Sequence, residues 1–166
     1  MKAIVAVDKN WGIGKNNDLL FSLPADMRFF RETTLSKVVV MGRKTLQSFP
    51  NGKPLKNRVN IVLTSRLGEA EGYTAVSSLD QLKVELAKYN ADDVYVIGGA
   101  MLYKTLLPYC SEVLVTKVDA DGGAEVFFEN LDADSSWTMT SASEVVETGG
   151  FNIRFTTYKN LQPIAF

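Results

Sequence analysis

The chain has 166 residues, of which 46% are hydrophobic and 22% are charged, and its formal net charge is −1. This size and balance are typical of one globular domain spanning residues 1–166, and the small net charge speaks against a nucleic-acid or membrane-surface partner held by bulk charge. Because the sequence contains no histidine, it excludes histidine-based triads, histidine general bases and histidine-ligated zinc, and we expect no metal site.

The amino-terminal segment and the absence of a long apolar run make a cytoplasmic protein the default. Met1–Asp8 reaches an acid too early for a signal peptide, and no apolar run approaches the length of a membrane span. Cys110 is the only cysteine, which excludes an intrachain disulfide, and its apolar neighbours favour a packing role over a nucleophilic one. We expect a cytoplasmic monomer without membrane contact.

Short β-branched runs alternate with helical stretches along most of the chain, a pattern typical of an α/β sheet with crossover helices. In chain order we expect a strand at Ala3–Val7, a helix at Pro24–Thr34, a strand at Lys37–Met41, a short helix near Arg43–Phe49, a strand at Val59–Thr64, a helix at Leu79–Tyr89 that begins with a Ser78/Gln81 capping box, a strand at Val94–Ile97, a helix at Met101–Leu107 and a strand at Val113–Val118.

The last part of the chain has a different pattern. Trp137–Val146 and Phe151–Lys159 flank Thr148-Gly149-Gly150, which predicts an antiparallel hairpin. The sequence therefore predicts an α/β fold: a single mixed, mostly parallel β-sheet flanked by helices, with a C-terminal antiparallel hairpin.

Asp26 is the first candidate functional residue. Pro24 suits the first turn of a helix, and helical spacing places Asp26 on one face with Leu23, Met27 and Phe30. A carboxylate on the apolar face of a helix costs free energy unless it has a partner. The alternative is an ordinary first-turn acid that interacts with the helix dipole.

Candidate ligand-binding residues follow three of the predicted strands. In open α/β sheets, ligands bind beyond the carboxyl ends of the strands. The segments at those ends combine glycines, cations and hydroxyls: Gly42-Arg43-Lys44-Thr45, Leu63-Thr64-Ser65-Arg66 and Ile97-Gly98-Gly99-Ala100. Glycines let a ligand approach the backbone, and a helix that begins there offers free N–H groups to a phosphate. Taken singly, each segment also reads as a tight turn or as solvated surface.

The dinucleotide fingerprint G-x-G-x-x-G is absent. Gly12-Ile13-Gly14 supplies two of its glycines, but Asn17 stands at the third and no helix is predicted to follow. A dinucleotide would therefore bind without the Rossmann glycine pattern.

Six segments in this order resemble the dihydrofolate reductase family across about Ile4 to Tyr158. They are Gly12-Ile13-Gly14, Leu23-Pro24-Ala25-Asp26, Val40-Met41-Gly42-Arg43-Lys44-Thr45, Pro54-Leu55-Lys56-Asn57-Arg58, Val96-Ile97-Gly98-Gly99-Ala100-Met101-Leu102-Tyr103 and Val115-Thr116-Lys117-Val118-Asp119. The resemblance implies hydride transfer from NADPH to 7,8-dihydrofolate, with protonation of N5.

On this resemblance, Asp26 is the acid that binds the pterin, Thr116 orients its carboxylate, and Arg58 pairs with the glutamate α-carboxylate of folate. The implied folate-pocket residues also include Ile4, Val5, Ala6, Leu19, Met27, Phe30, Phe49, Leu55, Ile97 and Tyr103. The segment Gly14–Leu20 is implied to be a lid that excludes water from the reaction.

The resemblance also implies the NADPH site. Gly42, Arg43, Lys44 and Thr45 match pyrophosphate and adenosine contacts, whereas Thr64, Ser65 and Arg66 lie where the family holds the 2′-phosphate. Gly98 and Gly99 match a pair joined by a cis peptide bond. The remaining implied cofactor residues are Ala6, Ile13, Leu19, Leu63, Ile97, Ala100, Met101, Leu102 and Tyr103.

Two departures from the family pattern affect the expected site. Phe21 stands where a tryptophan is usual, and phenylalanine has no N–H to hold a water near the pterin. Ala124-Glu125 stands where Gly-Asp is common in the loop that contacts the lid, so a longer acid is expected to change the open–closed balance.

Two other functions are compatible with parts of the sequence. A pyrimidine reductase of the riboflavin pathway shares the fold and the nicotinamide cofactor, but it does not require the Leu-Pro-x-Asp acid. A non-catalytic nucleotide-binding module is the other alternative, and Phe21 is the feature that favours it.

Overall fold

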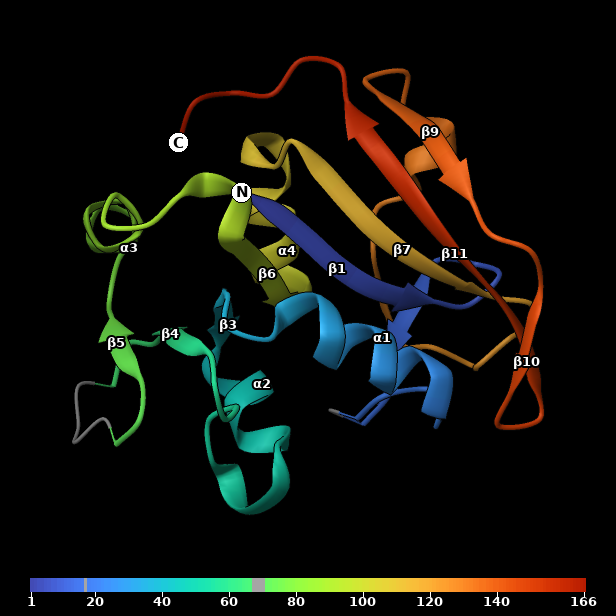
Figure 1. The fold of residues 1–166 in the computed structure, drawn as a ribbon, viewed down its shortest axis with the longest axis horizontal. Helices are drawn as coiled ribbons and strands as arrows, with labels where there is room; N and C mark the ends of the chain where they lie inside the picture. Colours follow the sequence, from blue (N-terminus) through green and yellow to red (C-terminus); the bar gives the residue numbers. More distant parts are fainter. Residues whose placement is uncertain (17, 67–70) are drawn as a thin grey trace.

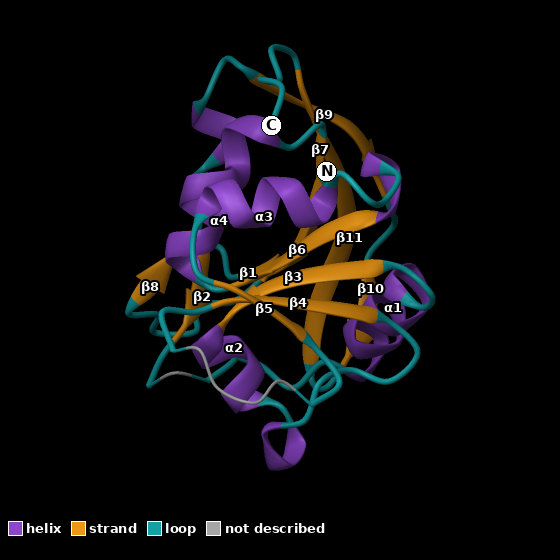
Figure 2. Cartoon of the chain, turned by 90° about the vertical axis from the view of Figure 1, so that its left-hand side faces the viewer, coloured by secondary structure: helices purple, strands orange, loops and turns teal. Residues whose placement is uncertain are grey.

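The computed structural model describes residues 1–16, 18–66 and 71–166. Its described residues form a nine-stranded sheet in which β11, β7, β1, β6, β3, β4 and β5 follow one another, and β9 and β10 both pair with β11 (Figures 1 and 2). The body of the sheet is parallel: β1 (Lys2–Val7), β3 (Val38–Gly42), β4 (Val59–Leu63), β5 (Thr74–Val76), β6 (Val94–Gly98) and β7 (Glu112–Val118). The antiparallel part consists of β9 (Trp137–Ala142), β10 (Val146–Thr148) and β11 (Phe151–Asn160).

Helices cover both faces of the sheet. Figure 2 shows α3 (Leu79–Leu86) and α4 (Ala100–Leu106) on one side, with α1 (Pro24–Thr34) and α2 (Arg43–Ser48) on the other. Short 3₁₀ turns occur at Pro50–Gly52, Ala91–Asp93, Leu107–Tyr109 and Leu131–Ala133. A separate two-stranded ribbon joins β2 (Gly12–Gly14) to β8 (Val126–Phe127).

The period of two along each strand divides the core between the two faces. Along β3, Val38 and Val40 belong to the larger core cluster under α3 and α4, whereas Val39 and Met41 pack with Leu46 of α2. The side chains that face α1 and α2 therefore belong to alternate residues of neighbouring strands. A site between these helices and the sheet would be lined by those residues.

The predicted fold class is confirmed, and α1 has the predicted bounds. The predicted hairpin is wrong in one respect, because its first arm is two strands rather than one. β9 pairs with the far end of β11 and β10 with its near end. Between them the Ser143 hydroxyl accepts a hydrogen bond from the Phe155 amide at 2.9 Å, so a side chain replaces the ladder partner there.

The third helix is shorter than predicted. The capping bond is present, since the Gln81 amide donates to Ser78 Oγ at 3.1 Å. The helix ends at Leu86, however, and the next residues form tight turns in which Lys88 and Tyr89 donate to carbonyls three residues back. Within the described part of the chain, no helix is long and apolar enough to cross a membrane, and no group of three or more His, Cys, Asp or Glu side chains is arranged to hold a metal ion.

Candidate active site

Asp26 lies in the first turn of α1, and its carboxylate points at the sheet. Thr116 of β7 donates a hydrogen bond from Oγ1 to Asp26 Oδ1 at 2.6 Å. Burial raises the pKa of Asp26 above its ordinary value, and the Thr116 bond opposes that rise because it stabilises the ionised form. The predicted pairing of Asp26 with Thr116 is thus present, and burial dominates the electrostatics of the acid.

A cleft of about 320 Å³ opens beside Asp26. It is lined by the start of α1, the strand β1 and the segment before α1: Ala6, Ile13, Asp18, Leu19, Leu20, Phe21, Ser22, Leu23, Asp26 and Met27. Six of the predicted site residues are therefore together here: Ala6, Ile13, Leu19, Phe21, Asp26 and Met27.

Two apolar side chains of this cleft are unusually exposed. Leu19 is 75% exposed and Met27 is 64% exposed. The expectation that Met27 shares a buried face with Asp26 is wrong, since only Leu23 on that face is fully buried, at 3% exposure. Large apolar side chains that border a concave site are what an apolar ligand covers on binding.

Strand alternation decides which predicted pocket residues reach the face of the sheet that α1 covers. Ala3, Val5 and Val7 belong to the core cluster under α3 and α4, so Ile4 and Ala6 point to the opposite face, the one on which Thr116 meets Asp26. The structure therefore does not bring the Val5 side chain to the cleft. Ile97 lies on the α2 side, where it packs, as Phe49 and Leu55 do, against the core cluster that contains Met41 and Leu46. Phe30 is half-buried on α1.

Arg58 lies at the carboxyl end of α1. Its Nε donates to Thr34 Oγ1 at 2.9 Å, and its two terminal nitrogens donate to the Lys56 carbonyl at 2.7 Å and the Arg31 carbonyl at 3.3 Å. Burial, followed by the positive charge of Arg31, lowers the pKa of Arg58 from its ordinary value. These bonds fix the guanidinium beside the same helix that carries Asp26 at its other end.

The predicted cofactor segments converge at the carboxyl edge of the sheet. In register, Gly42 of β3 lies opposite Leu63 of β4, and Met41 lies opposite Gly98 of β6. A Cβ built on Gly42 would lie 3.9 Å from the Gly99 nitrogen. The peptide bond between Gly98 and Gly99 is cis.

Two further observations show that this edge suits a phosphate-bearing cofactor. A Cβ built on Gly98 would lie only 3.0 Å from Thr45 Oγ1, so the glycine leaves the backbone open beside that hydroxyl. The buried Arg43 Nε has no hydrogen-bond partner among the described residues, and an anion is the partner that a guanidinium N–H prefers. Thr64 is 7% exposed and accepts a bond from the Arg66 amide at 3.1 Å.

The segment Gly14–Leu20 is bonded to the loop that follows β7. The main-chain amide of Asn16 donates to Glu125 Oε1 at 3.0 Å, and the main-chain amide of Glu125 donates to the Gly14 carbonyl at 2.9 Å. Glu125 stands where aspartate is common in the family, and its side chain contacts the predicted lid through the Asn16 main-chain amide. Residue 17 of that segment lies outside the described residues.

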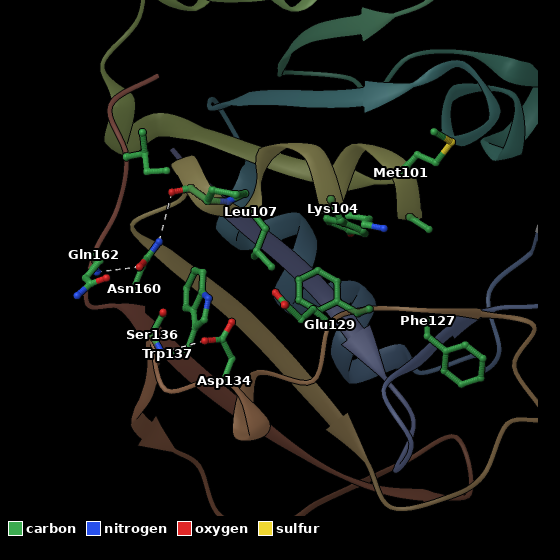
Figure 3. Close-up of a pocket in the computed structure, with 15 residues that line it drawn as sticks. Met101, Lys104, Leu107, Phe127, Glu129, Asp134, Ser136, Trp137, Asn160 and Gln162 are labelled. Carbon is green, nitrogen blue, oxygen red and sulfur yellow. Dashed lines mark hydrogen bonds between the residues drawn. The ribbon is translucent and has the colours of Figure 1, made fainter.

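A larger cavity, of about 770 Å³, lies between α4, the segment 127–137 and the segment 160–164 (Figure 3). Asp26 is not part of its lining. Three predicted cofactor residues, Ala100, Met101 and Tyr103, are at its border. Tyr103 is deeply buried and donates to the Ile4 carbonyl at 2.7 Å, and burial, then the charges of Asp26 and Cys110, raise its pKa. Leu102 is a core residue. The cleft at Asp26 is the smaller space, but it contains the half-buried acid.

Sequence reasoning missed three polar residues that shape the site. Asp8 is 2% exposed and accepts bonds from the amides of Asn10, Gly12 and Gly122, which ties β2 to the loop after β7. Asn60 holds the segment that carries Arg58, through the Leu55 amide and carbonyl and the Arg58 carbonyl. A polar residue inside an apolar strand run was the signal for Asn60. Thr148, which accepts a hydrogen bond from the Ala25 amide, had no such signal.

Cys110 has the predicted packing role. It is fully buried, its Sγ donates to the Leu106 carbonyl at 3.4 Å, and burial raises the pKa of its thiol to about 12. A thiol with that pKa is not a nucleophile near neutral pH.

The fold and the site together define an α/β protein with a half-buried acid in a cleft at the sheet and a glycine-rich, cationic edge next to it. The family model described as dihydrofolate reductase matches residues 1–160. A dihydrofolate reductase of Bacillus subtilis is 39% identical over 142 residues, which cover 85% of this chain and 82% of that protein. A dihydrofolate reductase of Schistosoma mansoni is 34% identical and covers 95% of both chains.

A solved structure shows the same likeness. The dihydrofolate reductase from Enterococcus faecalis, complexed with NADP(H) and RAB-propyl, has a TM-score of 0.83 and 32% identity, over 96% of this chain and 95% of that one. The chain belongs to the dihydrofolate reductase family, and it is an oxidoreductase that uses NADPH to reduce 7,8-dihydrofolate.

Proposed function

We propose that the cleft beside Asp26 binds the pterin ring of 7,8-dihydrofolate and that Asp26 is the residue that recognises it. The observation that carries this proposal is the half-buried Asp26 carboxylate, bonded to Thr116 at 2.6 Å, at the edge of an apolar cleft. A carboxylate has more acceptor sites than Thr116 uses, so it can still accept bonds from a pterin ring N–H and the 2-amino group. Two such charge-assisted bonds in a dry cleft fix the ring in one orientation.

NADPH supplies the hydride in this reaction. The residues proposed to bind it are the glycines, cations and hydroxyls at the carboxyl ends of β3, β4 and β6. The buried Arg43 Nε and the hydroxyl of Thr45 beside Gly98 support a site for the pyrophosphate. Thr64, Ser65 and Arg66 are proposed to bind the 2′-phosphate, and the positive charge of Arg66 favours NADPH over NADH.

The N5 proton is proposed to come from solvent rather than directly from Asp26. Asp26 binds the far side of the ring, where its negative charge polarises the pterin and makes N5 more basic. Phe21 lines the cleft without offering a hydrogen-bond donor, so no side chain at that position holds the water. Leu19 and the segment around it exclude bulk water when they cover the bound ring.

At the other end of α1, Arg58 is proposed to bind the glutamate α-carboxylate of the substrate. Its guanidinium already has a fixed orientation through Thr34 and two main-chain carbonyls. We also propose that the chain works as a cytoplasmic monomer of one domain, and the match of one family model to residues 1–160 supports the single domain.

The experiment that tests the proposed function follows NADPH absorbance with purified protein and dihydrofolate, with NADH in a parallel reaction. Dihydrofolate-dependent oxidation that is faster with NADPH supports the assignment. NADPH binding without dihydrofolate-dependent oxidation would contradict it, and the next substrate tested would be the phosphoribosyl pyrimidine of the riboflavin pathway.

A further inference from the structure

We propose that Thr148, at the tip of the β10–β11 hairpin, is a positioning residue for Asp26. This inference rests on the proposed function of Asp26 and adds a second side chain to the machinery that orients it. Thr148 Oγ1 accepts a hydrogen bond from the Ala25 amide at 3.0 Å, across 123 residues of sequence. Ala25 directly precedes Asp26, so the bond fixes the peptide group from which the acid extends.

The start of α1 needs an acceptor from elsewhere in the fold. The first N–H groups of a helix have no partner within the helix. At α1 the N-cap residue is Leu23, whose side chain makes no capping bond, and Pro24 has no N–H to satisfy. The Ala25 amide is therefore the first donor of the helix, and the hydroxyl of Thr148 acts for it as a local Ser or Thr cap does in other helices.

The hairpin tip also contacts the residues before α1 in two other ways. The Phe151 ring lies edge-on to the Phe21 ring, with centroids 4.7 Å apart and an interplanar angle of 61°. Gly149 has φ of +59°, and a Cβ built there would overlap the Ser22 carbonyl oxygen. Figure 2 shows β10 beside α1. The tip thus contacts positions 21, 22 and 25, all within five residues of Asp26.

Thr148 is well placed for a fixed bond, because it is only 9% exposed and lies opposite Phe151 in the hairpin register. Asp26 is consequently oriented from two sides. Thr116 holds the carboxylate, and Thr148 holds the main chain on the amino-terminal side. Without the Thr148 bond, the first turn of α1 gains freedom, and the carboxylate spends less time in the geometry that binds the pterin.

The test compares Thr148→Val, which keeps the shape but loses the acceptor, with Thr148→Ser, which keeps the hydroxyl. Thr156→Val is the matched control. Thr156 is also buried on β11, but its hydroxyl donates to the Val115 carbonyl and does not contact α1. Steady-state kinetics give KM for dihydrofolate and kcat, fluorescence titration gives the NADPH affinity, and amide hydrogen exchange reports on Ala25.

For Thr148→Val we expect the KM for dihydrofolate to rise about three- to tenfold, the effect of losing one helix cap. We expect the NADPH affinity to stay within about twofold and the Ala25 amide to exchange faster. Thr148→Ser should restore both values, and Thr156→Val should change neither. Gly149→Ala keeps the Thr148 hydroxyl but pushes the tip that carries it away from Ser22, so it should act in the same direction as Thr148→Val.

Three results would overturn the inference: an unchanged KM in Thr148→Val, an equal loss of NADPH and dihydrofolate binding, or no rescue by Thr148→Ser. Failure of the proposed function gives a different result, since wild-type protein would then show no dihydrofolate-dependent oxidation at all. The exchange rate of the Ala25 amide would still report whether Thr148 holds the helix start.

Discussion

Replacing Asp26 with asparagine removes the negative charge while leaving the shape of the side chain nearly unchanged. The Thr116 hydroxyl can still donate to the asparagine Oδ1, as it donates to Asp26 Oδ1 at 2.6 Å, so we expect the fold of the site to survive. The amide then presents an N–H₂ group where the pterin presents donors. Two charge-assisted hydrogen bonds, worth about 1.5–3 kcal/mol each, are lost.

The expected loss of transition-state stabilisation is therefore about 3–6 kcal/mol, or roughly 10²- to 10⁴-fold in kcat/KM for dihydrofolate at about 1.4 kcal/mol per factor of ten. NADPH affinity, measured by fluorescence titration, should stay within about twofold, because the acid faces the pterin and not the dinucleotide. Glu32→Gln, which neutralises an exposed acid on the same helix, is the control and should leave both values unchanged. An equal loss of NADPH affinity in Asp26→Asn would refute the assignment.

Four other expectations follow from the same geometry. Thr116→Val removes the bond that lowers the pKa of Asp26, so that pKa should rise and the pH–rate profile should move to higher pH, whereas Thr116→Ser should leave the profile in place. Arg58→Lys loses the planar guanidinium, which can bind a carboxylate through two N–H groups at once. The KM for dihydrofolate should therefore rise roughly tenfold without a change in NADPH affinity. Arg66→Gln should lower kcat/KM with NADPH roughly tenfold and leave the NADH reaction unchanged; equal losses with both would exclude a 2′-phosphate contact. Burial raises the pKa of Asp26 in the folded state, so Asp26 contributes to the free energy of folding below the ordinary pKa of 3.8, and this contribution is lost as pH rises through the folded pKa. At pH 7 the folded protein must therefore hold an ionised acid in a partly buried site. Asp26→Asn removes that cost and should raise Tm at pH 7, whereas below pH 3.8 it should give no gain.

The order of the longer strands and helices could be predicted from the sequence because each of them carries its own local signal, whereas the short strands β2, β5 and β8 were not predicted. Pro24 marks the start of α1, and β-branched runs mark β1, β3, β4, β6 and β7. The interruption between β9 and β10 could not be predicted in this way, because it depends on the Ser143 hydroxyl meeting the Phe155 amide on another strand. Local patterns do not contain that pairing.

The site shows the same division between local and long-range information. The period of two along β1 is a local property, and applied strictly it separates Ile4 and Ala6 from Val5, which the resemblance had grouped together. The bond between Thr148 and Ala25 joins residues 123 positions apart, and Thr148 alone reads only as part of a hairpin turn. The exposure of Met27 likewise depends on the cleft in front of α1, since helical spacing alone places it beside the buried Leu23.

A crystal structure of the protein with folate and NADP⁺ bound together would show directly whether Asp26 binds the pterin. We expect the pterin ring N–H and the 2-amino group each to lie about 2.7–3.0 Å from the Asp26 carboxylate oxygens, in the cleft bordered by Leu19 and Met27. A pterin bound instead in the larger cavity beside α4, or oriented with its amino group away from Asp26, would contradict it.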